Sequence, residues 1–142
     1  IALGTDGMSS HNSADFFSDL KLAACLHKGI RRDPTAVTAR QALYMATAGG
    51  ALALGRRDTG RIVPGYRADL ILVDFEAANL VPCHDIAENL VFAAHGANVV
   101  MNMARGKVIY KDGTFLTLDL DAIKSEVRRY ALPLVFGGSP TT

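Results

Sequence analysis

A short apolar run that ends in a carboxylate is the feature that most constrains this chain. Residues 1–5 are apolar or small, and Asp6 and Gly7 follow directly. Strands of a parallel barrel are buried on both faces, and their carboxyl ends carry side chains into the active site. The run therefore predicts the last strand of such a barrel, with Asp6 at its tip. No methionine precedes it, and we expect the other parts of the reaction centre to lie upstream.

The composition excludes several classes of partner. The formal net charge is +1 and the sequence pI is about 8.0, so nothing favours nucleic acid. No stretch approaches the roughly 20 apolar residues that a bilayer-spanning helix needs, and we expect no membrane segment. The two cysteines, Cys25 and Cys83, are too few for a disulfide framework. They favour a cytoplasmic protein with reduced thiols.

The chain is more apolar than an ordinary globular domain. Hydrophobic residues other than glycine make up 49% of it, and the mean hydropathy is +0.17. With glycine included, the apolar share exceeds the roughly 45–50% that is typical. No membrane segment accounts for this surplus of apolar residues. We therefore expect apolar surfaces that are covered by a missing part of the same protein or by further copies in a homo-oligomer.

Apolar spacing and turn residues predict the local structure. The predicted helices cover residues 15–28, 38–48, 51–54, 85–94 and 120–134, and the predicted strands cover residues 1–5, 68–74, 98–104 and 107–111, with a further short strand within 59–65. Ser13 is the expected cap of the first helix and Gly29 its end. Thr38 and Gln41 have the spacing of a capping box, and the pair Gly49-Gly50 is expected to break that helix.

Three further expectations follow from the same pattern. Turns are expected at Arg105-Gly106 and at Asp112-Gly113. Residues 68–74 are expected to form a buried strand. The first helix is expected to carry an apolar stripe at helical spacing, formed by Phe16, Leu20, Ala23 and Ala24.

This pattern divides the chain into three parts. Residues 1–55 are predicted to form the carboxyl-terminal end of the barrel, with its last strand and trailing helices. Residues 56–118 are predicted to form a small β-rich unit. Residues 119–142 are predicted to form a terminal helix and a loose tail. The expected fold class is thus α/β with a β-rich unit.

A series of short motifs in a fixed order carries a resemblance to a known family. The motifs are Gly4-Thr5-Asp6-Gly7, Ser10-His11-Asn12, Met45-Ala46-Thr47, Gly50-Ala51, Ala53-Leu54-Gly55, Gly60-Arg61-Ile62, Gly65-Tyr66-Arg67-Ala68-Asp69-Leu70 and Arg105-Gly106-Lys107. Together they resemble the C-terminal third of the metal-dependent amidohydrolase superfamily. The nearest branch is that of the cytosine-deaminase-like enzymes, which includes chlorohydrolases, guanine deaminases and adenosine or S-adenosylhomocysteine deaminases.

The resemblance implies a fold and a reaction. The implied fold is a TIM-type barrel with a small composite β-sandwich, of which residues 56–118 would supply part. The implied reaction is attack by metal-activated water on a C–N bond other than a peptide bond, deaminating a purine, pyrimidine, triazine or related nucleoside. The implied cofactor is a divalent metal, zinc in the first place and iron as the alternative.

The same resemblance implies roles for four residues. Asp6 would be a metal ligand and the catalytic acceptor of a proton, and Ser10, His11 and Asn12 would contact the substrate. The family takes its other ligands from a His-x-His pair and a later histidine, but this chain contains no His-x-His. Because one ligand cannot hold a catalytic metal, we expect neither metal nor turnover in this chain alone. The missing amino-terminal part of the enzyme is the implied partner.

Simpler explanations stay open at this stage. Asp6 before Gly7 also fits a capped turn, and His11 and Asn12 are common loop residues. For the whole protein, a dechlorinating hydrolase of the same branch is the alternative to a deaminase. For the isolated chain, the alternative is a non-catalytic assembly module.

Overall fold

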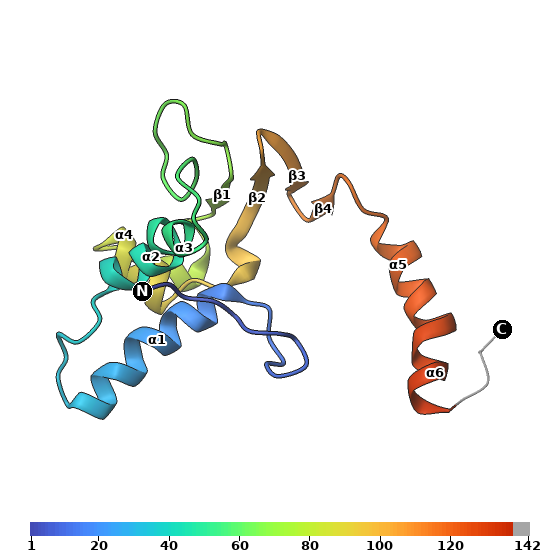
Figure 1. Cartoon of the computed structure of the whole chain (residues 1–142), viewed down its shortest axis with the longest axis horizontal. Coiled ribbons are helices and arrows are strands. Elements are labelled where there is room, and N and C mark those ends of the chain that lie inside the picture. Colours follow the sequence, from blue (N-terminus) through green and yellow to red (C-terminus); the bar gives the residue numbers. More distant parts are fainter. Residues whose placement is uncertain (138–142) are drawn as a thin grey trace.

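The computed structural model describes residues 1–137, which form a group of helices, a small sheet and a projecting helical arm (Figure 1). The helices are α1 (Phe16–Arg31), α2 (Ala39–Ala46), α3 (Ala48–Ala53), α4 (Ile86–Phe92), α5 (Leu120–Glu126) and α6 (Leu132–Phe136). The strands are β1 (Leu70–Val73), β2 (Val99–Ala104), β3 (Lys107–Lys111) and β4 (Thr114–Phe115). Short segments join them: the 3-10 turns η1 (Ala78–Leu80) and η2 (Gly96–Asn98), and the π-helical turn η3 (Val127–Ala131). This confirms an α/β fold with a β-rich unit.

The core lies where α1, α2 and α4 meet. Its buried residues are Leu20, Ala24, Ala39, Ala42, Ala87 and Val91. Four of the six are alanines, and such small side chains let helix axes approach closely while the two larger ones fill the remaining space. The loop that follows Asp6 leads into α1, so this core fixes the element that anchors the loop.

Helix α1 begins and ends later than the sequence predicts. Asp15, not Ser13, is the N-cap: its side chain accepts a hydrogen bond from the Phe17 N–H, while Ser13 Oγ accepts one from the Asp15 N–H. The helix continues through Gly29 to Arg31, and Arg32 closes it in the left-handed conformation (φ 51°). A single glycine weakens a helix by only about 1 kcal/mol, and here the surrounding turns outweigh it.

The capping box of α2 is confirmed, but the predicted break is misplaced. Thr38 and Gln41 exchange the side-chain and backbone hydrogen bonds of the box. The chain bends at Thr47 (φ −119°, ψ −94°), whereas Gly49-Gly50 lies inside α3. A Cβ at Gly49 would lie 2.8 Å from the Ile1 carbonyl oxygen. Glycine is therefore required there by the close approach of the amino-terminal segment.

The sheet is an antiparallel meander in the order β1-β2-β3-β4. Both predicted two-residue turns are confirmed, with positive φ at Arg105-Gly106 (50° and 77°) and at Asp112-Gly113 (46° and 83°). Two expectations were wrong: residues 59–65 form turns without a strand, and β1 is not buried throughout, since Ile71 and Leu72 are 45% and 52% exposed. An apolar sequence predicts a strand that packs against other residues, but it does not show whether those residues belong to the same segment of chain.

Helix α4 returns the chain from the sheet to the helical core between β1 and β2. Its N-cap Asp85 accepts hydrogen bonds from the N–H groups of Ala87 and Glu88. The turns on either side are joined by a reciprocal amide pair, in which the Asn79 and Asn98 side chains donate to each other at 2.9 and 3.0 Å. The helical body thus includes a segment from the predicted β-rich part, and the three domain bounds stay a prediction.

Residues 1–5 form no strand, contrary to expectation. They are held instead by a hydrogen bond from the Leu3 N–H to the Met45 carbonyl oxygen and by the contact with Gly49. A strand is defined by the ladder it forms with neighbours, and residues 1–137 offer none to this segment. The barrel therefore stays a prediction.

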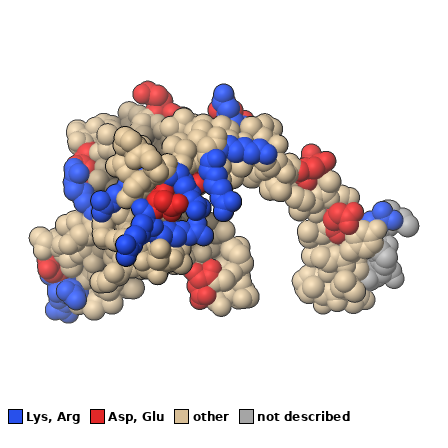
Figure 2. All heavy atoms as spheres, turned by 45° about the horizontal axis from the view of Figure 1, so that its top comes forward, with Lys and Arg blue, Asp and Glu red and all other residues tan. Residues whose placement is uncertain are grey.

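The carboxyl-terminal arm carries an unburied apolar stripe. Asp119 caps α5, and the helix runs through η3 into α6, so that Pro133 follows a π-helical turn without ending the helix. The stripe consists of Leu120, Ile123, Val127, Tyr130 and Leu134, between 40% and 86% exposed. Figure 2 shows Lys and Arg side chains mixed with acidic ones over the body, and mostly uncharged surface on the arm. The predicted loose tail falls largely on residues 138–142, outside the described part.

None of the helices within residues 1–137 combines the length and the apolar character that spanning a bilayer requires.

Replacement of Leu20 by alanine should destabilise the helical core. Leu20 is 3% exposed and belongs to the core cluster, and such deletions cost about 2–5 kcal/mol in unfolding free energy. The exposed neighbour Lys21→Ala should change it by less than about 0.5 kcal/mol. Denaturant unfolding followed by circular dichroism measures both, and equal losses would contradict the assigned core.

Asp69 should make stability depend on acid pH. Its carboxylate accepts hydrogen bonds from the Arg105 N–H at 2.6 Å and the Thr59 hydroxyl at 3.2 Å. The Arg105 N–H, then the Thr59 hydroxyl and the charges of Arg67 and Arg105, hold the pKa of Asp69 below its usual 3.8, against the opposing effect of burial. A lowered folded-state pKa adds stability that is present above the unfolded value and lost as pH falls through the folded one.

Asp69→Asn should therefore show a smaller loss of stability than the unaltered chain when pH falls below about 4. Urea unfolding at a series of acid pH values measures this. Identical acid limbs for the two proteins would show that the turn does not depend on the carboxylate.

Candidate functional site

Asp6 lies in an exposed, tight turn. Its backbone is in the left-handed region (φ 59°), which aspartate tolerates better than most residues. Its Oδ1 accepts a hydrogen bond from the Gly7 N–H at 2.6 Å, so the turn-capping explanation is correct for one oxygen. Its Oδ2 accepts no hydrogen bond from residues 1–137 and is available to a metal or a proton.

The segment after Asp6 folds back on itself. The N–H groups of Ser10 and His11 both donate to the Gly7 carbonyl oxygen, at 2.9 and 3.0 Å. Ser10 and Asn12 are exposed, and within the described chain their side chains make no hydrogen bond. The structure thus keeps the predicted residues on one short loop, which we call the Asp6 loop (residues 6–13).

His11 differs from its loop neighbours because both ring nitrogens have partners. Nδ1 accepts a hydrogen bond from the Ser13 N–H at 3.1 Å, and Nε2 lies 3.2 Å from Asp19 Oδ1. The His11 side chain is 34% exposed, whereas that of Asp19 is 8% exposed. A histidine held in this way has no nitrogen left for a substrate or a metal.

Asp15 ties the start of α1 to the far side of the core. One carboxylate oxygen caps the helix, and the other accepts a hydrogen bond from the Gly96 N–H at 3.0 Å. The two residues are 81 positions apart. The Asp6 loop is therefore followed by a fixed point, not by a free hinge.

The described residues do not form a complete metal site. Among residues 1–137, no three His, Cys, Asp or Glu side chains come together in a way that could hold a metal ion. The chemistry of Asp6 still fits one position of a zinc site, since carboxylate oxygen is an ordinary zinc ligand and Oδ2 is accessible. The fit is that of a single ligand, and a zinc site at Asp6 would need further protein ligands.

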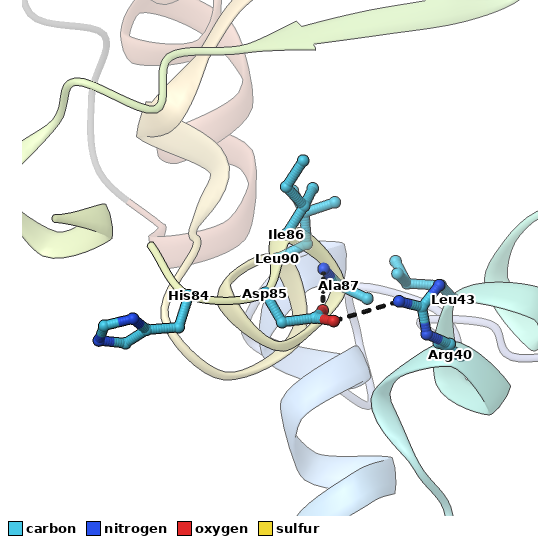
Figure 3. A pocket seen from close by; sticks show the side chains of 7 residues that line it. All are labelled: Arg40, Leu43, His84, Asp85, Ile86, Ala87 and Leu90. Carbon is cyan, nitrogen blue, oxygen red and sulfur yellow. Dashed lines mark hydrogen bonds and ion pairs between the residues drawn. The ribbon is translucent and has the colours of Figure 1, made fainter. Parts of the chain in front are cut away.

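A hollow lies away from this loop, between α2 and α4 (Figure 3). Its volume is about 430 Å³, and it is lined by Arg40, Leu43, His84, Asp85, Ile86, Ala87 and Leu90. Arg40 pairs with Asp85 at 3.1 Å, while the His84 side chain points away from that pair. The N–H groups of Glu88 and Ala87 and the Arg40 guanidinium hold the pKa of Asp85 below its usual value, against the effect of burial. A carboxylate so fully engaged is a structural cap.

Sequence reasoning missed Asp15 and Asp19. Asp19 lies three residues after Phe16 and four before Ala23, so it falls on the predicted apolar stripe of its helix. A carboxylate on an apolar stripe needs a partner, and His11 is the nearest polar aromatic residue upstream. That pattern was the available signal for the pair.

Comparison with known proteins identifies relatives of the whole chain. The sequence pattern of the Amidohydrolase family matches residues 1–109. A 5-methylthioadenosine/S-adenosylhomocysteine deaminase of Pelotomaculum thermopropionicum is 46% identical over 95% of this chain and 31% of its own length. A 5'-deoxyadenosine deaminase of Methanosarcina barkeri is 43% identical over the same shares. The chain spans about a third of the length of the relatives that it matches.

Solved structures give the same result. An adenosine deaminase from Xanthomonas campestris with bound zinc superimposes with a TM-score of 0.89 and 36% identity, over 94% of this chain and 31% of that one. An atrazine chlorohydrolase from Arthrobacter aurescens, complexed with zinc and atraton, gives a TM-score of 0.76 and 29% identity over 84% and 27%.

The family pattern covers more than three quarters of the chain, and the chain therefore belongs to the amidohydrolase family.

Proposed function

We propose that this chain is part of a metal-dependent hydrolase that deaminates an adenine nucleoside. The observation that carries the proposal is the 46% identity with a deaminase over 95% of the chain. The exposed carboxylate of Asp6, in a turn that keeps one oxygen available, supplies the matching chemistry. The substrate class follows the names of the relatives, which act on 5-methylthioadenosine, S-adenosylhomocysteine or 5'-deoxyadenosine.

A dechlorinating hydrolase is the second candidate. It is favoured by the similarity to the atrazine chlorohydrolase, at 29% identity. The deaminases share more of the sequence, and deamination is the function we put first.

We propose further that residues 1–5 become the last strand of a TIM-type barrel in the complete enzyme. The exposed apolar faces of β1 and the arm support this proposal, because each needs a covering surface. The domain bounds of 1–55, 56–118 and 119–142, with the second part in a composite β-sandwich, belong to the same proposal. We also propose that the complete enzyme forms a homo-oligomer, in which further copies cover part of these apolar faces.

Zinc is the metal that we propose, with iron as the alternative, because two similar structures contain zinc. When bound, such a metal acts as a Lewis acid and lowers the pKa of the attacking water. Asp6 Oδ2 would hold it, together with ligands from the rest of the enzyme.

Deamination replaces an amino group of the base by the oxygen of water and releases ammonia. A proton must leave the water, and protons must reach the departing nitrogen. The Asp6 carboxylate accepts the first proton, and the Gly7 N–H on Oδ1 keeps its plane fixed while it does so. The exposed Ser10 and Asn12 side chains bind polar groups of the substrate, whereas His11 has both nitrogens engaged within the loop.

The cytoplasm is the location that we propose. Cys25 and Cys83 are both exposed, and neither is in a disulfide within the described residues. Exposed free thiols suit a reducing compartment.

The isolated chain should neither retain zinc nor deaminate. Its described residues bring no three ligands together, and one carboxylate cannot hold a catalytic metal. Elemental analysis after dialysis, with assays on adenosine, 5'-deoxyadenosine and S-adenosylhomocysteine, measures both properties. Stoichiometric zinc with turnover would show that the chain is self-sufficient.

Asp6→Asn in the complete enzyme should leave less than a tenth of the rate. Asparagine keeps the shape of the turn but loses the charge and the ability to accept a proton, and a tenfold loss corresponds to about 1.4 kcal/mol in the barrier. The measurement is kcat and KM with 5'-deoxyadenosine.

Asp112→Asn is the matched control for this substitution. Asp112 also has positive φ (46°) and precedes a glycine, but it lies in the β3–β4 turn. The control should keep the full rate. Equal effects of the two substitutions would refute the role of Asp6.

A further inference from the structure

Asp19 is a buried carboxylate with an unusual set of partners. It lies on the core-facing side of α1, next to the buried Leu20, and is 7% exposed. Its Oδ1 lies 3.2 Å from Nε2 of the His11 imidazole, and the His11 side chain is 34% exposed. Its Oδ2 is fully buried and has no hydrogen-bond partner among residues 1–137.

The backbone fixes which nitrogen of His11 carries the proton. The Ser13 N–H points at Nδ1, so Nδ1 must accept and cannot carry a hydrogen. In a neutral imidazole the hydrogen is then on Nε2, where it faces Asp19 Oδ1. The ring therefore bridges the backbone of the loop to the carboxylate on α1.

Stability alone does not explain a carboxylate at this position. A buried carboxylate with an unpaired oxygen costs free energy, and an apolar side chain would pack on the stripe beside Leu20 without that cost. The carboxylate is instead the acceptor that keeps the His11 ring in one orientation.

The orientation of His11 reaches Asp6 through two backbone contacts. The His11 N–H donates to the Gly7 carbonyl oxygen at 3.0 Å, and the Gly7 N–H donates to Asp6 Oδ1 at 2.6 Å. These two groups lie in the adjacent peptide units on either side of the Gly7 Cα, so a shift of His11 reaches the N–H that orients the Asp6 carboxylate through a single residue.

We propose that Asp19 is a positioning residue for the Asp6 carboxylate and acts through His11. The proposal rests on the proposed function, in which Asp6 is a metal ligand. It assigns to His11 the task of holding the loop, and leaves contact with the substrate to Ser10 and Asn12.

The test is a double-mutant cycle in the complete zinc-loaded enzyme, with His11→Ala, Asp19→Ala and the double variant. Two properties are measured: the rate of zinc loss to a chelator, and the hydrogen exchange of the amides in residues 7–13. Loss of a partner that orients a metal ligand typically weakens metal binding about 10–100-fold. Each single variant should therefore lose zinc at least about tenfold faster and exchange faster in the loop.

The double variant decides whether the two residues act as a unit. If Asp19 acts through His11, the double variant should lose zinc no faster than the worse single variant. The proposal would be overturned if the increases in zinc-loss rate of the two single variants multiply in the double variant. It would also be overturned if the single variants behave like the unaltered enzyme.

Asn98→Ala is the control for general loss of stability. Asn98 is also buried, at 5% exposure, and hydrogen-bonded, but its partners are Asn79 and His95. At a temperature well below its unfolding transition it should keep the zinc-loss rate of the unaltered enzyme. If Asn98→Ala loses zinc as fast as Asp19→Ala, the faster zinc loss is explained by lower stability alone, and the proposal is overturned.

Asp6→Asn separates this proposal from the proposed function. If that variant holds zinc as firmly as the unaltered enzyme, the ligand role of Asp6 fails. The exchange of residues 7–13 then still tests whether Asp19 and His11 hold the loop, and unchanged exchange in both single variants would refute it.

Discussion

The close contact of α1, α2 and α4 across small side chains is the constraint on which the rest of this structure depends. Ala24, Ala42 and Ala87 are at most 9% exposed and leave room for the helices to approach. Helix α4 lies between β1 and β2 in the sequence, so the chain of the sheet is anchored to the same core. The loop that carries Asp6 leads directly into α1 and takes its position from the contact.

Carboxylates that accept backbone hydrogen bonds fix the loops to this framework. Asp15 joins the start of α1 to Gly96, Asp69 joins the segment before β1 to the β2–β3 turn, and Asp85 caps α4. Each accepts at least one hydrogen bond from a backbone N–H group, which fixes the carboxylate relative to that backbone. Asp19 differs because its described partner is a side chain on the Asp6 loop, His11. That difference is the reason for assigning it a task beyond stability.

The sequence predicted those features whose causes are local. The capping box of Thr38 and Gln41 and the turns at Arg105-Gly106 and Asp112-Gly113 depend on residues at most three positions apart, and all three formed. The order of short motifs led to the correct family for a similar reason, since the motifs can be read without the fold.

Features that depend on distant partners could not be predicted in this way. The Asp15–Gly96 hydrogen bond spans 81 positions, and no local pattern announces it. A strand at residues 1–5 needs neighbouring strands, and the exposure of Ile71 and Leu72 depends on what lies against β1. The candidate site was predicted as a set of four residues. The engagement of both His11 nitrogens became visible only when Ser13 and Asp19 were placed around the ring.

The central claim is that the Asp6 loop supplies one ligand to a metal centre that the rest of a longer enzyme completes. Anomalous diffraction at the zinc edge, from crystals of the complete enzyme, tests it most directly. The account predicts a zinc peak about 2.0–2.2 Å from Asp6 Oδ2, with the Gly7 N–H still bonded to Oδ1. A zinc ion bound elsewhere, with no contact to Asp6, would contradict it.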